Sequence, residues 1–340
     1  MKKLEFLVLF NLTIGTLCAQ PSIQWQYCYG GSEYDEATSV QVCLNSDLVF
    51  AGVSQSTDGN VSGALGFDDF WIIRTKNSGQ IIWSKCYGGS NHEKPYSIQQ
   101  TLDRGFIVAG FTKSSDGDVT GQHGASDAWI LKIDSTGQIQ WQKCLGGEGH
   151  DLAWDICQTK DGGYVFAGQS GEIGGDVTGN NGYFDCWVVK LDSEGALVWQ
   201  RSIGGGSYDI GYCIQETEDS GFILCGESQS NDGDVSVNFG NSDYWVVKLN
   251  FEGKIEWEQS YGGSALDRAN EIQQTPDGGF LVFGQSRSVN GQVSGNHGGF
   301  DAWLLKVDSI GNLLWQNPLG GTSEDFGRAF IQKEDGNIWA

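Results

Sequence analysis

The chain has 340 residues, of which 43 are Asp or Glu and 20 are Lys or Arg, so its formal net charge is −23. Such a charge repels nucleic acid and anionic membrane surfaces. We therefore predict that the protein has no nucleic-acid partner. After the first residues no apolar run approaches the roughly 18 residues of a membrane-spanning helix, so we predict no membrane insertion.

The N-terminus has the pattern of an export signal. Two lysines within residues 1–3 precede an apolar run over residues 6–17 and a small residue, Ala19. A basic start, a short apolar centre and a small residue before the cleavage point are typical of secretory signals. We therefore predict a signal peptide over residues 1–19 and a protein that is secreted or held at the cell surface. A lipid-anchoring cysteine at Cys18 is the alternative interpretation.

The rest of the chain is a tandem repeat marked by tryptophan. Trp25 and Trp83 are 58 residues apart, and two tryptophan series keep this interval along the chain. The series are Trp25, Trp83, Trp141, Trp199, Trp257 and Trp315, and Trp71, Trp129, Trp187, Trp245 and Trp303. Because a single unit cannot bury its own apolar faces, such repeats must stack against their neighbours.

Each unit is predicted to contain four short β-strands. In the unit that begins at Gly88, the expected strands cover residues 97–101, 106–110, 128–133 and 139–145. These segments are rich in β-branched and aromatic residues and are bounded by Gly and Asp. Four antiparallel strands that recur every 40 to 60 residues or so are typical of a β-propeller blade. The predicted fold class is all-β, a β-propeller of 58-residue four-stranded blades.

The links between the expected strands divide between two faces of the ring. We name the strands a to d from the ring centre outward. The a–b and c–d links are tight turns, in which we expect glycine to take the positive φ. The d-to-a crossings and the long b–c loops lie together on the opposite face, which we call the loop-rich face. Ligands are expected to meet this face.

The repeat count predicts five complete blades and two partial ones. An isolated d-type strand is expected over residues 23–29, and a sixth unit stops at residues 338–340 inside its strand b. In many propellers an N-terminal d strand closes the ring and so removes exposed sheet edges. We expect residues 20–340 to form one propeller repeat domain, incomplete at its C-terminus, from a longer protein that is a monomer at full length.

Three motifs of the second unit carry a resemblance to a known group. They are Tyr-Gly-Gly-Ser at 87–90, Asp-Gly-Asp-Val-Thr-Gly at 116–121 and Asp-Ala-Trp-Ile-Leu-Lys at 127–132. They resemble the tandem propeller repeats of secreted proteins from Bacteroidetes-type bacteria, and the resemblance covers the chain from Ile23 onward. It implies an extracellular location, and in some members an accessory role in polysaccharide degradation.

Strands c and d also resemble the tryptophan-docking repeat of quinoprotein dehydrogenases. Asp134, Gly137 and Trp141 match the Asp, Gly and Trp of that repeat, but the turn is one residue shorter. Because no cofactor residues are recognisable, we interpret the match as shared blade packing, and no quinone cofactor is predicted.

Acids that recur in every unit are interpreted as scaffold, since a catalytic carboxylate pair would be asymmetric. One series lies two residues before the second tryptophan: Asp69, Asp127, Asp185, Asp243 and Asp301. The other lies in the d-to-a crossings: Asp35, Asp151, Asp209, Asp267 and Asp325. We predict that these side chains cap backbone N–H groups.

The b–c loops contain acids that alternate around glycine. Asp116 and Asp118 form one such pair, and Asp232 and Asp234 form another. Alternating carboxylates suit a hard cation such as calcium, which prefers oxygen ligands. One loop has lost both acids, and the EF-hand pattern is incomplete. Two interpretations stay open: a calcium site, or a hydrogen-bonded turn fixed by the buried Val119 and its equivalents.

Positions that break the repeat mark a candidate ligand site. Three residues after the crossing acid, successive units carry Thr38, Tyr96, Trp154, Tyr212, Asn270 and Arg328. This position lies where strand a enters the ring, near the mouth of the central funnel. We predict that Tyr96, Trp154 and Tyr212 form a stacking platform for sugar rings. The predicted acidic neighbours are Glu93, Asp151 and Asp209. Packing between blades is the alternative role of the three rings.

The predicted function is binding rather than catalysis. The sequence contains no Gly-x-Ser-x-Gly elbow and no ordered Ser, His and Asp set. We expect a secreted or surface propeller whose ligand is an extracellular glycan or a surface protein. The first alternative is a polysaccharide-degrading enzyme of endoglucanase type, or an accessory part of one. Such an enzyme needs two non-repeated carboxylates in the funnel, for which Glu93 and Glu172 are the candidates. A quinone-dependent dehydrogenase is the third candidate function, after binding and polysaccharide degradation.

Overall fold

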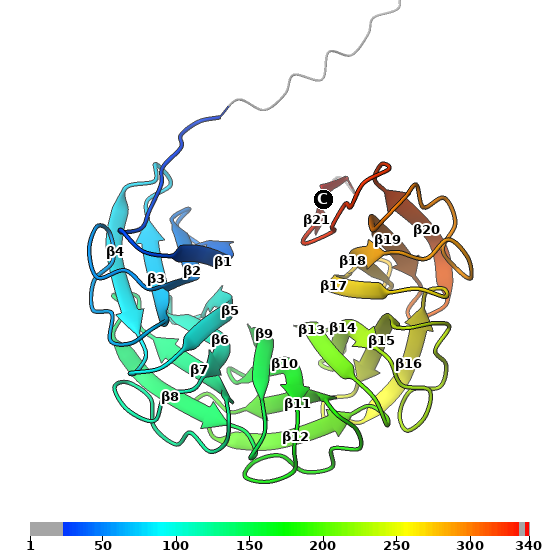
Figure 1. Cartoon of the computed structure of the whole chain (residues 1–340), viewed down its shortest axis with the longest axis horizontal. Helices are drawn as coiled ribbons and strands as arrows, with labels where there is room; N and C mark the ends of the chain where they lie inside the picture. The colour runs from blue at the N-terminus through cyan, green and yellow to red at the C-terminus, as the bar shows by residue number, and fades with distance from the viewer. Residues whose placement is uncertain (1–22, 333–336, 340) are drawn as a thin grey trace, which may run out of the picture.

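The computed structural model describes residues 23–332 and 337–339. The regular structure of this part of the chain is β-strand throughout, in five four-stranded sheets and one two-stranded sheet. Figure 1 shows the sheets arranged as blades around a common centre, which confirms the predicted β-propeller. The predicted signal peptide, residues 1–19, lies outside the described residues. The described residues contain no helix long and apolar enough to cross a membrane.

Blade 1 consists of β1 (Asp35–Val42), β2 (Leu48–Ser54), β3 (Asp69–Thr75) and β4 (Ile81–Tyr87). Blade 2 consists of β5 (Glu93–Gln100), β6 (Phe106–Thr112), β7 (Asp127–Ile133) and β8 (Ile139–Leu145). Blade 3 consists of β9 (Leu152–Gln158), β10 (Tyr164–Ser170), β11 (Asp185–Leu191) and β12 (Leu197–Ile203). Blade 4 consists of β13 (Asp209–Glu216), β14 (Phe222–Ser228), β15 (Asp243–Leu249) and β16 (Ile255–Tyr261). Blade 5 consists of β17 (Asp267–Gln274), β18 (Phe280–Ser286), β19 (Asp301–Val307) and β20 (Leu313–Leu319), and β21 (Ile331–Gln332) and β22 (Ile338–Trp339) form the short sixth sheet.

Each blade follows the predicted a-b-c-d order, for example β5-β6-β7-β8 with antiparallel pairs. Strand c of blade 2, β7, is buried along its whole length, whereas the outermost strand β8 begins exposed. Strands b and c read as continuous apolar runs because blades cover both of their faces. The four strands predicted for the second unit are therefore confirmed.

Tryptophans of both series join neighbouring blades. Trp187 is fully buried in the core between blades 2 and 3, and its indole N–H donates to Gln200 Oε1 at 2.8 Å. Trp141, on strand d of blade 2, packs at the edge of the same core, 5.5 Å from the ring of Tyr164 in blade 3. The same contact recurs for Trp83 with Phe106, Trp199 with Phe222 and Trp257 with Phe280. The predicted stacking of each repeat against its neighbours is confirmed.

The tight turns confirm one prediction and correct another. In the c–d turns glycine takes the positive φ, as at Gly195 with φ 78°. In two a–b turns the positive φ falls one residue before the expected glycine, on Arg104 with φ 66° and Ser220 with φ 65°. In blade 1, where the turn has no glycine, it falls on Ser46 with φ 67°. Gly105 instead leaves room for the buried Lys132, because a Cβ at this position would lie 2.7 Å from the Lys132 Nζ.

We expect Gly195→Ala to destabilise the protein by about 1–2 kcal/mol, because it adds a left-handed non-glycine residue. The new Cβ would also lie 2.9 Å from the Trp141 ring. Ser220→Gly is the matched control, since it places glycine at an existing positive φ and should change stability by less than about 1 kcal/mol. Urea unfolding measures both. Equal midpoints for Gly195→Ala and the parent would contradict the expected strain.

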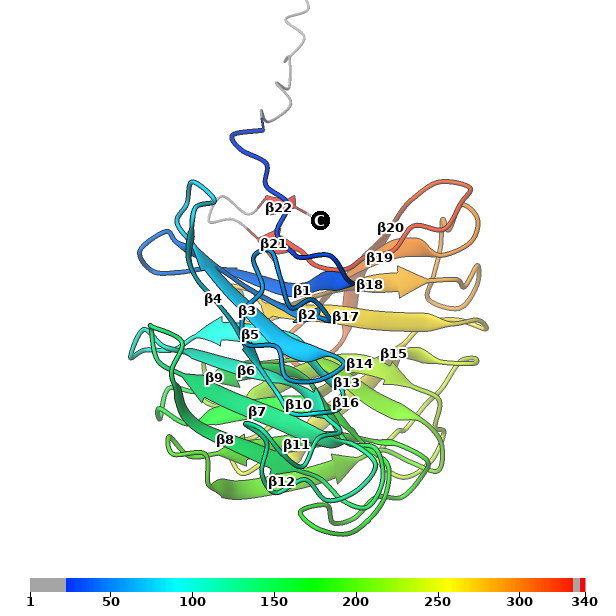
Figure 2. The same ribbon diagram turned by 60° about the vertical axis from the view of Figure 1, so that its left-hand side comes forward.

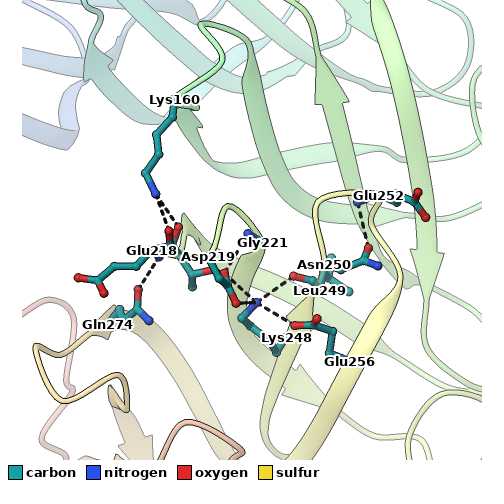
Figure 3. Close-up of polar contacts among 11 residues, drawn as sticks. Lys160, Glu218, Asp219, Gly221, Lys248, Leu249, Asn250, Glu252, Glu256 and Gln274 are labelled. Atoms are coloured by element: carbon teal, nitrogen blue, oxygen red, sulfur yellow. Dashed lines mark hydrogen bonds and ion pairs between the residues drawn. The ribbon is translucent and has the colours of Figure 1, made fainter.

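A buried lysine fastens the a–b turn to strand c in four blades. Lys248 is 4% exposed, and its Nζ lies 3.0 Å from both Asp219 and Glu256 (Figure 3). The corresponding pairs are Lys132–Asp103, Lys190–Asp161 and Lys306–Asp277. Desolvation acts to raise the pKa of Asp219, but the hydrogen bonds from Thr217, Gly221 and Lys248 outweigh it and lower that pKa to about 2. These charges hold the a–b and c–d turns together on one face, as predicted.

The innermost strands lie side by side around the centre and are bridged by glutamine side chains. The Gln158 N–H donates to Gln99 Oε1 at 2.6 Å, and the Gln274 N–H donates to Gln215 Oε1 at 3.0 Å. Each bridge joins a strand a to the strand a of the next blade. The glutamines therefore satisfy backbone N–H groups on the inner sheet edges.

The two ends of the array flank an opening in the arc (Figure 1), and in the turned view of Figure 2 the first and last blades both lie at the top. Residues 23–29 form no strand, so the predicted isolated d strand is wrong. The segment keeps a d-strand side-chain contact, because the Tyr29 hydroxyl donates to the Gly79 carbonyl at 2.5 Å, as Tyr87 donates to Gly137 at 2.8 Å. Among the described residues no neighbouring strand pairs with this segment, and a ladder requires one.

Candidate functional site

The first residues of the innermost strands surround a central cavity. This upper cavity encloses about 570 Å³, and its lining includes Tyr96, Trp154 and Tyr212. A lower cavity of about 380 Å³ continues along the same strands and is lined by later residues such as Gln99 and Gln215. Because the strands a begin at the d-to-a crossings, the upper cavity lies toward the loop-rich face.

The three rings predicted as a platform are brought together, and we call them the aromatic arc. The ring centroids of Tyr96 and Trp154 are 4.0 Å apart, and those of Trp154 and Tyr212 are 5.4 Å apart. Each ring comes from a different blade and is partly exposed. The arc is thus an inter-blade contact that also lines the cavity, and its role as a platform for sugar rings stays a prediction.

A β-bulge aims each ring at the cavity. In blade 2 the pairing of β5 with β6 shifts between Pro95 and Ser97, which leaves Tyr96 as the extra residue. The shift in blade 3 leaves Trp154 unpaired, and that in blade 4 leaves Tyr212 unpaired. A bulge interrupts the strict alternation of side chains, so two consecutive residues reach the same side.

A second layer of polar groups holds the arc in place. Trp154 donates its indole N–H to Gln169 Oε1 at 3.2 Å, and the Tyr212 hydroxyl donates to Glu227 Oε1 at 2.9 Å. Arg268 binds Glu227 at 2.8 Å and lies 5.0 Å above the Tyr212 ring. Burial and the charge of Glu227 raise the pKa of Tyr212, which therefore stays a neutral donor.

Sequence reasoning missed this second layer, although a signal was present. The position occupied by Gln169 and Glu227 is Val53 and Phe111 in the preceding units. It breaks the repeat in the same way as the arc position does. Applying the same criterion to strand b would have found both residues.

The acids predicted beside the platform do not face it. Glu93, Asp151 and Asp209 are completely buried. They accept N–H bonds from Gly89, Gly147 and Gly205 at 2.8, 2.7 and 2.8 Å. The prediction of these three as ligand neighbours is wrong, because each carboxylate turns back to close the d-to-a crossing of its own blade.

The carboxylates that do line the cavity are Asp155 and Glu271, each of which directly follows a bulge residue. Asp155 accepts from the Ser97 hydroxyl at 2.7 Å and from the Ile214 N–H at 3.0 Å. Glu271 accepts from the Phe330 N–H at 2.8 Å. Burial raises the pKa of Asp155, and burial together with the charge of Asp155 raises that of Glu271 to about 7.

The acids of the b–c loops bind the backbone of the crossings. Asp116 Oδ1 accepts the Ser90 N–H at 2.7 Å, and Asp232 Oδ1 accepts the Gly206 N–H at 2.7 Å. Asp118 and Asp234 each approach a crossing glycine N–H at 3.3 Å. Within residues 23–332 and 337–339 no group of three or more His, Cys, Asp or Glu side chains is placed to hold a metal ion. The contacts match the hydrogen-bonded turn, and the calcium site stays a prediction.

A further set of carboxylates meets at the blade junctions. A Cβ at Gly88 would lie 2.3 Å from Asp69 Oδ1 and 2.5 Å from Glu93 Oε2, so both oxygens border this glycine. Asp69 Oδ1 is buried without a hydrogen-bond partner, while Asp69 Oδ2 accepts the Leu65 N–H at 2.6 Å. Burial raises the pKa of Asp69 to about 6 and that of Asp243 to about 7. The capping role predicted for the repeated acids is confirmed.

Fold and site together define a β-propeller with an aromatic-lined central cavity. No protein-family model matches the chain. Over 162 residues the chain is 26% identical to the regulatory protein FlaEY of Caulobacter vibrioides, a match that covers 44% of this chain and 17% of that protein. The match therefore spans less than two thirds of that relative's length.

Solved structures similar to this chain come from several sources. A protein of unknown function from Bacteroides caccae is 13% identical, with 87% of each chain covered and a TM-score of 0.47. BamB from Moraxella catarrhalis is 15% identical, with 93% of this chain and 87% of that chain covered and a TM-score of 0.42. The WD40 domain of Pan2 from Neurospora crassa is 13% identical, with 88% and 83% covered and a TM-score of 0.47. At these identities the likeness concerns the fold alone.

Proposed function

We propose that this protein is an exported binding module whose ligand is an extracellular glycan seated on the aromatic arc. One observation carries the proposal: three side chains that break the repeat, on three neighbouring blades, contact one another and line a single cavity of about 570 Å³. A ligand site can vary at such positions while the repeated scaffold keeps the fold.

The chemistry of the cavity suits a sugar. Aromatic faces bind the apolar C–H faces of sugar rings, and neighbouring polar groups bind their hydroxyls. Thr38, Ser39 and Asn270 line the same cavity as the arc. The predicted export signal and the resemblance to secreted repeats support an extracellular ligand. A surface protein is the alternative ligand.

Hydrolysis of a polysaccharide is the second candidate function. Asp155 and Glu271 are two non-repeated carboxylates that line one cavity, which is what a glycosidase requires. Of the two candidates from the sequence, Glu93 is completely buried at a crossing and Glu172 is exposed on a b–c loop. Since Asp155 and Glu271 each accept a backbone N–H of the following blade, they also have a structural role, and we place binding first.

Trp154→Ala should weaken glycan binding at least tenfold, a loss of about 1.4 kcal/mol, because it removes the central ring of the arc. Its effect on the melting temperature should be small, since the ring is only partly buried. A glycan array identifies the ligand, and calorimetry measures its affinity. Phe67→Ala is the control, because Phe67 is a 65% exposed aromatic residue outside the cavity lining. Equal affinities for Trp154→Ala and the parent would contradict the assignment.

A further inference from the structure

The central cavity holds two carboxylates without a counter-ion. Asp155 and Glu271 line both the upper and the lower cavity, and the described lining of the two contains no Lys or Arg. Of the cations near the mouth, Arg268 is paired with Glu227 at 2.8 Å and Lys94 with Glu36 at 2.8 Å. The exposed Arg328 stacks on Phe326 at 5.8 Å. None of these cations therefore forms an ion pair with Asp155 or Glu271.

The two carboxylates differ in the number of hydrogen bonds that they accept. Asp155 accepts three hydrogen bonds, from Ser97, Ile214 and Ile156. Glu271 accepts one, from the Phe330 N–H through Oε2. Burial and the nearby Asp155 raise the pKa of Glu271, as expected where a carboxylate lacks a positive partner. A cation in the cavity would supply that partner.

We propose that the glycan bound on the aromatic arc carries protonated amino groups, and that Glu271 together with Asp155 pairs with them. This inference rests on the proposed function and names its ligand class, an amino sugar. The arc favours the same group, because an ammonium is attracted to aromatic faces and most strongly to tryptophan. A neutral N-acetylated sugar offers the rings the same C–H faces but leaves the carboxylates unpaired.

The test compares glucosamine oligosaccharides with N-acetylglucosamine oligosaccharides of equal length, by calorimetry at about pH 7. At this pH amino groups are still largely protonated, and Glu271, with a pKa raised to about 7, is partly ionised. We expect the parent protein to bind the amine form at least tenfold more tightly. The double variant Asp155→Asn and Glu271→Gln should bind both forms equally, with an affinity for the acetylated form close to that of the parent. An amide oxygen can still accept the Ile214 and Phe330 N–H bonds, so the blade contacts are retained.

The outcomes separate this inference from the proposed function. Equal binding of the two forms by the parent, with both weakened by Trp154→Ala, would overturn the amine preference and leave glycan binding standing. Binding of neither form, together with an empty glycan array, would overturn both. A double variant that kept the preference would assign it to other residues. Release of shorter oligosaccharides by the parent but not by Glu271→Gln would show that the acids act in hydrolysis.

Discussion

Replacing Trp187 by alanine should lower the free energy of unfolding by about 3–5 kcal/mol, the range for a large aromatic side chain removed from a packed core. Trp187 is 0% exposed and packs 5.4 Å from the Phe166 ring in the core between blades 2 and 3. The truncation leaves a cavity there and deprives Gln200 of its indole donor. Urea unfolding followed by tryptophan fluorescence and circular dichroism measures the loss.

Trp315→Ala is the matched control for this prediction. Trp315 belongs to the other tryptophan series and is 43% exposed, so its removal creates no closed cavity. We expect a change of less than about 1 kcal/mol. If the two variants were equally stable, the inter-blade cores would not be the main source of stability in this repeat.

Stability should be highest near pH 4 and fall toward both pH 8 and pH 3. The junction acids Asp69, Asp185 and Asp243 have folded-state pKa values raised by burial to about 6, 6 and 7. Such groups contribute stability that is complete below the unfolded pKa of about 3.9 and is lost as the pH rises through the folded pKa. The net charge of −23 adds repulsion in the same direction.

Below about pH 4, the aspartates of the a–b turns make the stability of the protein fall as the pH decreases. The lysine-paired Asp161 and Asp219 have pKa values lowered to about 2, with their hydrogen bonds outweighing desolvation. A lowered pKa contributes stability above the unfolded value of about 3.9, and this stability is lost as the pH falls toward 2. Urea midpoints measured from pH 3 to pH 8 test the resulting maximum.

Asp243→Asn tests the cause of the loss above pH 4. An amide oxygen can still accept the Phe239 N–H, but it does not titrate. We expect the variant to lose less stability than the parent between pH 4 and pH 8. A parent protein whose stability rose steadily to pH 8 would mean that these junction carboxylates are ionised in the folded state at pH 5.

The repeat made much of the architecture predictable. Since equivalent positions take equivalent places in stacked units, the 58-residue interval was enough to predict the blade, the stacking of neighbouring blades and the proximity of Tyr96, Trp154 and Tyr212. The prediction of a strand over residues 23–29 was wrong because a strand requires a paired neighbour as well as a suitable sequence pattern.

The sequence by itself determined the blade, its turns and the position at which the units differ. Only the tertiary structure decided which acids face the cavity. Glu93 is buried at a crossing because its carboxylate closes onto the Gly89 N–H, whereas Asp155 and Glu271 reach the cavity because a bulge precedes each of them. Strict alternation along strand a would send two consecutive residues to opposite faces. The bulge turns both toward the centre, and a register shift of this kind is set by the pairing with strand b.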